Sequence, residues 1–484
     1  MSGITIGWAS RDITPKDKVR IMGQFHVRVS TGIESPLSCT AMAIEHDGAH
    51  LILVSVDAAF VADPITRECR RRLREEVPGL EATGVCIFAT HTHTAPVQGP
   101  SWYPEELPRG VAPDEEYADM LTDSLTEVIK EAWNARSPAQ ASSGWAPAVV
   151  AHNRRMHYSD STGQMYGPTG TPAFRNIEGS TDHSVNLLFT YDREGELTGI
   201  VVNVPCPSQS RETESFISAD FWHETREELK RRYGDHIFVL PQCGFAGDLS
   251  PHPLIHSAEH LRMLHMKGMI PSADLPPRAA EVTAAECHLI AGRIAAAVED
   301  ASSACEAARK ADLPIAHSYR ILNLPRRMVT AEEARLCAQE AAAEREQLAK
   351  LPIDPAEFSY TSSRSRIFYN ERVVERFSEQ RDDLTYPAEV HVLRIGDAAM
   401  VFVGFEVYLD YGLRVQERSP ADQTFTVQLL SQEGTKSGGY LPTERAVKAG
   451  HYGGDVRDNT VGPEGGQVLV DGIVQMLEEM WDAE

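Results

Sequence analysis

The chain has 484 residues, a formal net charge of −24 and 42% hydrophobic residues, which is typical of a soluble globular protein. So acidic a balance argues against nucleic acid or an anionic membrane as a stable partner, because both require a basic surface. No run of apolar residues approaches the roughly 20 that a membrane-spanning helix needs.

The cysteines and the N-terminal residues indicate in which cellular compartment the protein is expected. Eight cysteines are scattered without a Cys-x-x-Cys pair, a pattern that favours reduced thiols over a disulfide framework. The first residues show no basic region followed by an apolar core, so we expect no signal peptide. We therefore expect a cytoplasmic protein whose partner is a small-molecule substrate. Assembly into a homo-oligomer is compatible with this composition.

The first part of the chain predicts alternating strands and helices. Strands are expected at 4–8, 40–45 and 51–57, and the last is apolar almost throughout, as is typical of a strand covered on both faces. A helix at 64–77 leads into a strand at 85–89, which completes a strand–helix–strand unit. A second helix, 114–133, begins with acidic residues that suit a helix N-terminus.

The middle of the chain has more strand character. Strands at 183–191 and 198–204 are expected to pair, and the polar residues 159–182 to form a loop over the site. A helix at 220–233 and a strand at 236–240 precede a glycine-containing segment, 243–251.

We expect one domain spanning 1–484. Within it, 279–370 is a candidate helical insertion, with helices at 279–310 and 330–351 and a polar link at 351–369. A hairpin at 388–405, a strand at 424–430 and a helix at 468–481 complete the chain. We predict an α/β fold of mixed sheets flanked by helices.

One strand runs directly into a pair of histidines. In an extended chain His91 and His93 would point to the same side and address one site, and Pro96 would end the strand soon after. In α/β proteins the carboxyl edge of a sheet is where ligands usually bind. A surface histidine pair is the alternative interpretation.

Four segments share one pattern, in which a strand is followed by a turn that carries His, Cys, Glu or Tyr. They are 90–96, 203–209, 404–408 and 438–442. Metal sites in α/β folds are built in this way, from the ends of separate strands. Each segment alone is weak evidence, since Cys206 is equally suited to a core and Glu406 to the start of a helix.

Together these segments resemble the neutral ceramidases and their ceramidase-like relatives. Residues 89–96 are similar to that family's Ala-Thr-His-Thr-His-Ser-Gly-Pro, and 247–252 to its Gly-Asp-Val-Ser-Pro-Asn. Residues 153–154 resemble its Asn-Arg-Ser, 404–406 its Pro-Gly-Glu, 440–443 its Tyr-Val-Thr-Thr and 451–453 its His-Tyr-Glu. The resemblance covers the catalytic domain, and we expect no counterpart of the family's C-terminal immunoglobulin-like domain or of its secretory leader.

The resemblance implies that His91, Glu406 and Tyr440 bind a zinc ion. Cys206 stands where the family has a further histidine ligand, and a thiolate is itself a good zinc ligand. Whether Cys206 is a metal ligand, a covalent nucleophile or a structural residue remains open. The resemblance also places four residues around the scissile amide and the developing oxyanion: His93, Arg154, Ser250 and Tyr452.

The implied activity is a zinc-dependent amidohydrolase that uses metal-activated water. Ser250 as a nucleophile ranks below it, because no Gly-x-Ser-x-Gly turn surrounds this serine, and Arg154 could instead be a structural ion-pair donor. The absence of a basic docking segment favours a polar N-acylated substrate over long-chain ceramide. An ester or lactone hydrolase acting on a carbohydrate-like substrate, and a metal-free binding protein of the same fold, are the alternatives.

Overall fold

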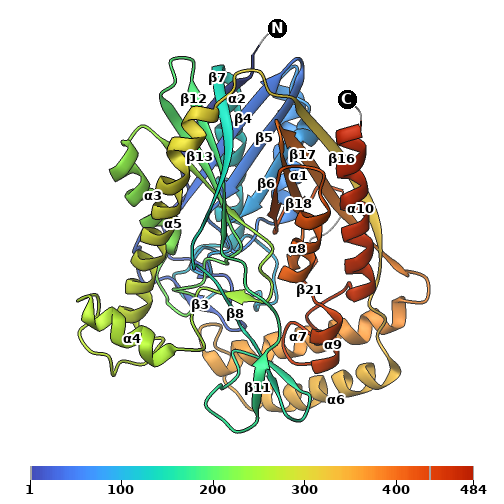
Figure 1. Cartoon of the computed structure of the whole chain (residues 1–484). Coiled ribbons are helices and arrows are strands. Elements are labelled where there is room, and N and C mark those ends of the chain that lie inside the picture. Colours follow the sequence, from blue (N-terminus) through green and yellow to red (C-terminus); the bar gives the residue numbers. More distant parts are fainter. Residues whose placement is uncertain (1–2, 435–437, 483–484) are drawn as a thin grey trace.

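The computed structural model describes residues 3–434 and 438–482. Figure 1 shows two β-sheets stacked against each other between outer layers of helices. The predicted α/β class, with mixed sheets flanked by helices, is confirmed.

The larger sheet has eight strands and contains the strand that leads to the histidine pair. Its only parallel pairs among the described strands are at its two edges, β5 with β6 and β13 with β14. In spatial order the strands are β14 (Phe238–Cys243), β13 (Leu197–Val204), β12 (Ser184–Asp192), β7 (Ser137–Pro147), β1 (Thr5–Asp12), β4 (Ser38–His46), β5 (Ala49–Val56) and β6 (Val85–Ala89).

The smaller sheet has four strands, in the order β16 (Ile315–Pro325), β17 (Thr385–Ile395), β18 (Ala398–Val403) and β20 (Gln423–Val427). The β17–β18 hairpin turns at Gly396, whose φ of +64° is one that glycine adopts without strain. One face of this sheet packs on the larger sheet, where Phe402 and Phe425 join Trp8 and Phe88 in a common core.

Helices cover the outer faces of both sheets. Buried Ile65, Cys69 and Leu73 recur at four-residue spacing in α1, which gives that helix one apolar face. The larger sheet is covered by α1 (Asp63–Glu76), α2 (Asp114–Asn134), α3 (Phe221–Tyr233) and α5 (Ala280–Ala308), and the smaller sheet by α8 (Leu409–Arg418) and α10 (Pro463–Asp482). Within the described residues, no helix combines the length and the apolar character needed to cross a membrane.

The range 279–370 differs from the expected helical insertion. Its first helix, α5, covers the larger sheet, and β16 is an edge strand of the smaller one. Only α6 (Ala331–Leu348) and α7 (Phe358–Glu379) form a helical pair. The prediction of a polar link at 351–369 is wrong from residue 358 on, where α7 begins. This helix buries mostly small and polar residues and so lacks the apolar stripe that marks a helix in sequence.

Short elements gather beyond the carboxyl ends of β6 and β13, in the lower half of Figure 1. Residues 159–182, expected as a loop, contribute two strands of a small sheet. These elements are β2 (Arg20–Ile21), β3 (Arg28–Val29), β8 (His152–Asn153), β9 (Arg155–Tyr158), β10 (Gly163–Met165), β11 (Phe174–Ile177), β15 (Leu249–Ser250), α4 (Ser257–Met266), β19 (Glu406–Val407), β21 (Tyr440–Leu441) and α9 (Glu444–Ala449). The short helix η1 (Ala82–Gly84) lies at the opposite end of β6, directly before its first residue.

Candidate functional site

The two histidines lie close together, but not as neighbours along one strand. β6 ends at Ala89, and His91 has a φ of +67°, in the left-handed region that non-glycine residues rarely adopt. The extended conformation predicted for this pair is therefore wrong. The turn nevertheless brings the ring centroids of His91 and His93 to 4.9 Å. Backbone strain of this kind is common where a functional geometry is held by the surrounding fold.

His91 is oriented by a backbone carbonyl and faces a carboxylate. Its Nδ1 lies 2.6 Å from the carbonyl oxygen of Ala59, which can only accept, so Nδ1 carries a proton. Its Nε2 lies 3.1 Å from Oε2 of Glu406. Burial alone would raise the pKa of Glu406, but His91, Arg154 and Tyr440 together hold it below its ordinary value. An ionised carboxylate and an imidazole nitrogen thus converge on one point.

Tyr440 lies beside Glu406 because β19 and β21 pair in parallel, with these two residues in register. Its hydroxyl accepts a hydrogen bond from Nη2 of Arg154 at 3.1 Å and lies 3.2 Å from the hydroxyl of Tyr452. Burial and the adjacent Glu406 raise the pKa of Tyr440 well above its ordinary value, so the phenol is neutral in this arrangement.

Arg154 is a buried cation held mainly by neutral groups. Its Nη1 donates to the hydroxyl of Tyr166 at 3.0 Å and to Oε1 of Gln209 at 3.2 Å. Its Nη2 donates to the carbonyl of Gly247 at 2.9 Å as well as to Tyr440. Among the described residues it forms no ion pair within 4 Å, so its charge is available to an anionic or strongly polar group.

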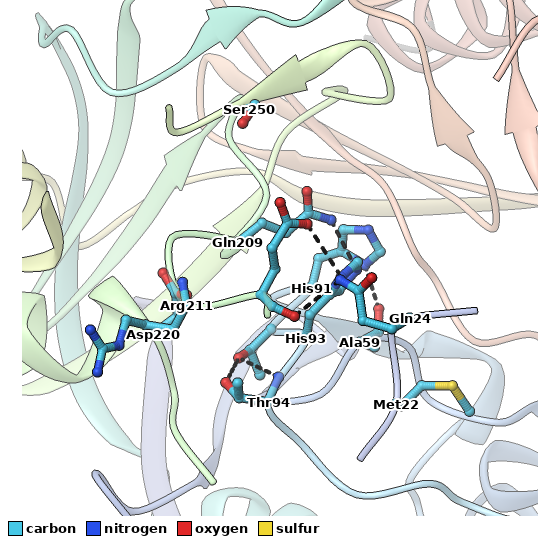
Figure 2. Close-up of polar contacts among 12 residues, drawn as sticks. Met22, Gln24, Ala59, His91, His93, Thr94, Gln209, Arg211, Asp220 and Ser250 are labelled. Carbon is cyan, nitrogen blue, oxygen red and sulfur yellow. Dashed lines mark hydrogen bonds and ion pairs between the residues drawn. The ribbon is translucent and has the colours of Figure 1, made fainter. Parts of the chain in front are cut away.

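His93 lies between an amide and a carboxylate. Its Nε2 is 2.9 Å from Nε2 of Gln209, and its Nδ1 is 3.8 Å from a carboxylate oxygen of Glu212. Burial, together with the nearby His91, Arg28 and Arg154, holds the pKa of His93 well below its ordinary value, so the ring is neutral. Figure 2 shows Gln209 beside both histidine rings.

Two of the expected site residues lie away from this cluster. Ser250 is buried, and its Oγ lies 3.3 Å from the hydroxyl of Tyr166, which accepts a hydrogen bond from Arg154. Cys206 is also buried, with its Sγ 3.5 Å from the carbonyl of Pro207 in the apolar core that includes Phe221 and Trp222. Burial raises the pKa of the Cys206 thiol well above its ordinary value. The fold therefore brings together His91, His93, Arg154, Glu406, Tyr440 and Tyr452, and leaves Ser250 and Cys206 outside.

A cavity of about 710 Å³ opens onto this cluster. Its wall includes His91, His93, Glu406, Tyr440 and Tyr452, and helix α7 contributes Tyr369, Arg372 and Arg376. Its aromatic side chains are in contact with one another: the ring centroids of Phe25 lie 5.4 Å from Tyr452 and 5.5 Å from Tyr369. The wall is therefore aromatic and charged.

Several residues of this site could not be predicted from sequence patterns. Gln209 falls within a segment that the sequence singled out, yet no motif marks a buried glutamine as a partner of histidine and arginine. Tyr166 lies in a stretch expected to be a loop, and Tyr369 in one expected to be a link. Only the three-dimensional arrangement shows these contacts.

The donor set fits a metal ion in part. Over residues 3–434 and 438–482, no group of three or more His, Cys, Asp or Glu side chains is arranged to hold a metal ion. The donors that do converge are Nε2 of His91 and the carboxylate of Glu406, with the phenol oxygen of Tyr440 beside them. A histidine whose Nδ1 donates to a carbonyl and whose Nε2 faces the site has the orientation of a metal ligand.

Two solved structures share this arrangement of sheets and helices. A ceramidase complexed with C2 superposes with a TM-score of 0.70 at 15% identity, over 100% of this chain and 76% of that chain. The neutral ceramidase from Pseudomonas aeruginosa gives a TM-score of 0.68 at 16% identity, over 99% of this chain and 75% of that chain. The fold is that of a neutral ceramidase.

The sequence resemblance is thus confirmed at the level of the ceramidase fold, over the whole length of this chain. In sequence comparisons, no family of known proteins matches the chain. No curated protein matches it either.

Proposed function

We propose that this chain is a metal-dependent hydrolase that cleaves the C–N amide bond of a polar N-acylated substrate, with zinc as its metal. The observation that carries the proposal is the approach of His91 Nε2 to Glu406 Oε2, 3.1 Å apart, in the wall of a large cavity. Two neighbouring structures with the ceramidase fold, one of them complexed with C2, support the reaction class.

His91, Glu406 and Tyr440 would hold the metal ion. A bound zinc ion lowers the pKa of a coordinated water and so supplies hydroxide at neutral pH. Cys206 is not positioned to complete this set, because its thiol is buried among apolar side chains. The remaining coordination position in this proposal is therefore open, as in catalytic rather than structural zinc sites.

Arg154 supplies fixed positive charge next to the proposed ligands. Its guanidinium donates to Tyr440 and is held by Gln209 and Gly247, so it is oriented before a substrate arrives. Such a donor can stabilise an oxygen that becomes negative as a carbonyl is attacked. The hydroxyl of Tyr452, 3.2 Å from that of Tyr440, adds a second donor on the same side of the cavity.

The cavity wall supports a polar substrate. Four arginines (Arg326, Arg372, Arg376, Arg457) and several carboxylates line it, which makes it a poor site for two long aliphatic chains. An N-acylated amino alcohol or carbohydrate derivative is the substrate class that we propose. All eight cysteines are free thiols, which supports a reducing, cytoplasmic location.

Metal analysis of the purified protein, combined with an activity screen, tests the proposal. We expect about one equivalent of zinc per chain in the wild type and a large loss in His91→Ala and Glu406→Gln. We also expect hydrolysis of short polar amides to exceed that of long-chain ceramide. Esters and lactones in the same screen test the alternative bond type.

A metal-free binding protein gives a different pattern. In that case the wild type would contain well under half an equivalent of metal, and His91→Ala would leave substrate-analogue binding unchanged. Zinc retained in both variants would likewise contradict the ligand set.

A further inference from the structure

A second cavity, of about 630 Å³, lies away from the candidate site, between α4 and α5. Figure 1 shows α4 beside the lower part of the long helix α5. The floor is formed by β8 and by the loop that follows β15. None of the residues that line the 710 Å³ cavity lines this one.

Apolar side chains at the cavity surface are unusually exposed. Val149, Ile177 and Met263 are 42%, 37% and 48% exposed, although each lies in the wall of the same cavity. Leu264 and Ile290 continue this surface inward. Such a surface is favourable for the apolar part of a ligand, because its burial removes apolar area from water.

The carboxylates in this cavity already have partners. Glu286 is 3% exposed, and its Oε2 and Oε1 lie 2.8 Å from Nδ1 of His252 and 3.1 Å from Nε2 of His260. Burial alone would raise the pKa of Glu286, but the two histidines lower it to about 2. Glu259 faces His256 at 3.6 Å.

The cations have no such partners. Arg293 donates from Nη1 to the carbonyl of Val149 at 2.8 Å and, within the described part of the chain, forms no ion pair; nor does Lys267 at the rim. Burial lowers the pKa of Arg293. The Nδ1 of His183 is buried and has no hydrogen-bond partner among the described residues. Within the described residues, the two cations are thus left without a counter-charge, and a ring nitrogen of His183 is left without a hydrogen-bond partner.

We propose that the α4–α5 cavity is a second ligand site, which binds a free organic carboxylate with an apolar tail. The carboxylate accepts hydrogen bonds from Arg293, with His183 nearby, and the tail lies along Val149, Ile177 and Met263. Charge complementarity selects the anion, since a neutral or cationic head group would leave the charge of Arg293 without a counter-charge. The site does not depend on the activity proposed for the other cavity.

Its inner end is joined to the candidate site by hydrogen bonds. His252, which contacts Glu286, donates from Nε2 to the carbonyl of Gln209 at 3.0 Å. The side chain of Gln209 contacts His93 and Arg154. Glu286 in the wall of one cavity is therefore connected through His252 and Gln209 to His93 in the wall of the other.

Calorimetric titration of the full-length protein with octanoate, octanol and octylammonium tests the proposal. We expect one equivalent of octanoate to bind, and octanol and octylammonium to bind at least tenfold more weakly, since a hydrogen bond to a charged group contributes enough for about that factor. Arg293→Gln should weaken octanoate binding about tenfold and leave octanol binding unchanged. Arg262→Gln, on the exposed side of α4, is the matched control and should bind like the wild type.

Two further variants place the ligand. Arg154→Gln should bind octanoate as the wild type does, and Met263→Glu, a change at a half-exposed position, should abolish binding without loss of the fold. Octanoate binding that survives Arg293→Gln but is lost in Arg154→Gln would overturn the proposal. So would binding to phosphatidylglycerol vesicles without binding to free octanoate, which would indicate an anionic lipid instead.

Discussion

Gln209 Nε2 lies 2.9 Å from Nε2 of His93, and the same amide accepts a hydrogen bond from Arg154 through Oε1. A guanidinium can only donate, so the amide oxygen must face Arg154 and the amide nitrogen must face His93. His93 Nε2 is therefore the acceptor, and the ring proton is on Nδ1, toward Glu212 at 3.8 Å. One buried glutamine thus sets both the tautomer of His93 and the orientation of Arg154.

Replacing this glutamine should reverse the tautomer. In Gln209→Glu the new carboxylate can only accept, so His93 must carry a proton on Nε2. We expect the Nε2 resonance of His93 to move from the unprotonated to the protonated range in nitrogen NMR of protein labelled in its histidines. The resonance is identified by its disappearance in His93→Gln, and the measurement needs no substrate.

Gln347→Glu, an exposed change on α6, is the matched control and should leave the His93 resonance in place. An unprotonated Nε2 in Gln209→Glu would mean that the amide does not determine the tautomer.

Asp248 should make the stability of the fold depend on pH. Its carboxylate accepts from the backbone N–H of Leu409 at 2.9 Å and from the side chain of Asn153 at 2.7 Å, yet burial raises its pKa to about 6. An unfolded aspartate has a pKa of about 4. The folded state therefore binds more protons than the unfolded state between these values, and the free energy of unfolding falls as pH rises from about 4 to about 6.

Between pH 4 and pH 6, the protonation of Asp248 changes the free energy of unfolding by about 3 kcal/mol. Asp248→Asn should remove it, so that the difference in urea unfolding free energy between pH 4.5 and 7 shrinks relative to the wild type. Asp274→Asn, an exposed change, should leave that difference as it is. Asp248→Ala should lower stability by about 2–4 kcal/mol at both pH values, because two buried donors lose their acceptor. An unchanged pH dependence in Asp248→Asn would contradict the assignment.

The regular elements of the fold could be predicted from sequence patterns, and the details of the site could not. The apolar strand 51–57 and the acidic start of α2 have local causes, so they were predictable. By contrast, α7 is held by α6 and by the small residues it buries, which leave no apolar period in the sequence. A helix that buries mostly small and polar side chains gives little periodic signal in the sequence.

The direction of a side chain is also set by distant contacts. The resemblance to neutral ceramidases placed Cys206 at a strand end, which is where it lies, but the core around Phe221 and Trp222 holds its thiol away from Glu406. The positive φ of His91 depends in the same way on Ala59 and Glu406. Spacing along a strand cannot reveal either feature.

The placement of Cys206 leads to a prediction about metal content. Cys206→Ala should keep the zinc content of the wild type and lower the free energy of unfolding by about 1 kcal/mol, because it only removes buried volume. Cys206→His should lower stability further, by about 1–3 kcal/mol, because the larger ring does not fit the core. Metal analysis and urea unfolding measure these effects. Zinc lost in Cys206→Ala and partly recovered in Cys206→His would show that the thiol is a ligand after all.

Phe25 should contribute to substrate binding through its exposed ring. The side chain is 41% exposed, although it lies in the cavity wall and contacts Tyr452 and Tyr369. A substrate that covers this ring removes apolar surface from water, which is worth about 1–2 kcal/mol. Phe25→Ala should therefore raise KM for the best polar amide about tenfold. Its metal content should stay that of the wild type, because the ring touches none of the proposed ligands.

Phe377→Ala is the matched control, since this phenylalanine is 37% exposed on α7 but does not line the cavity. Steady-state kinetics on both variants separates a binding effect from a general loss of stability, which would lower activity in the two alike. If KM is unchanged in Phe25→Ala while kcat falls, the ring positions the neighbouring tyrosines rather than the substrate. If neither constant changes, the substrate does not reach this wall, and the polar side formed by Arg326 and Asp458 becomes the place to test next.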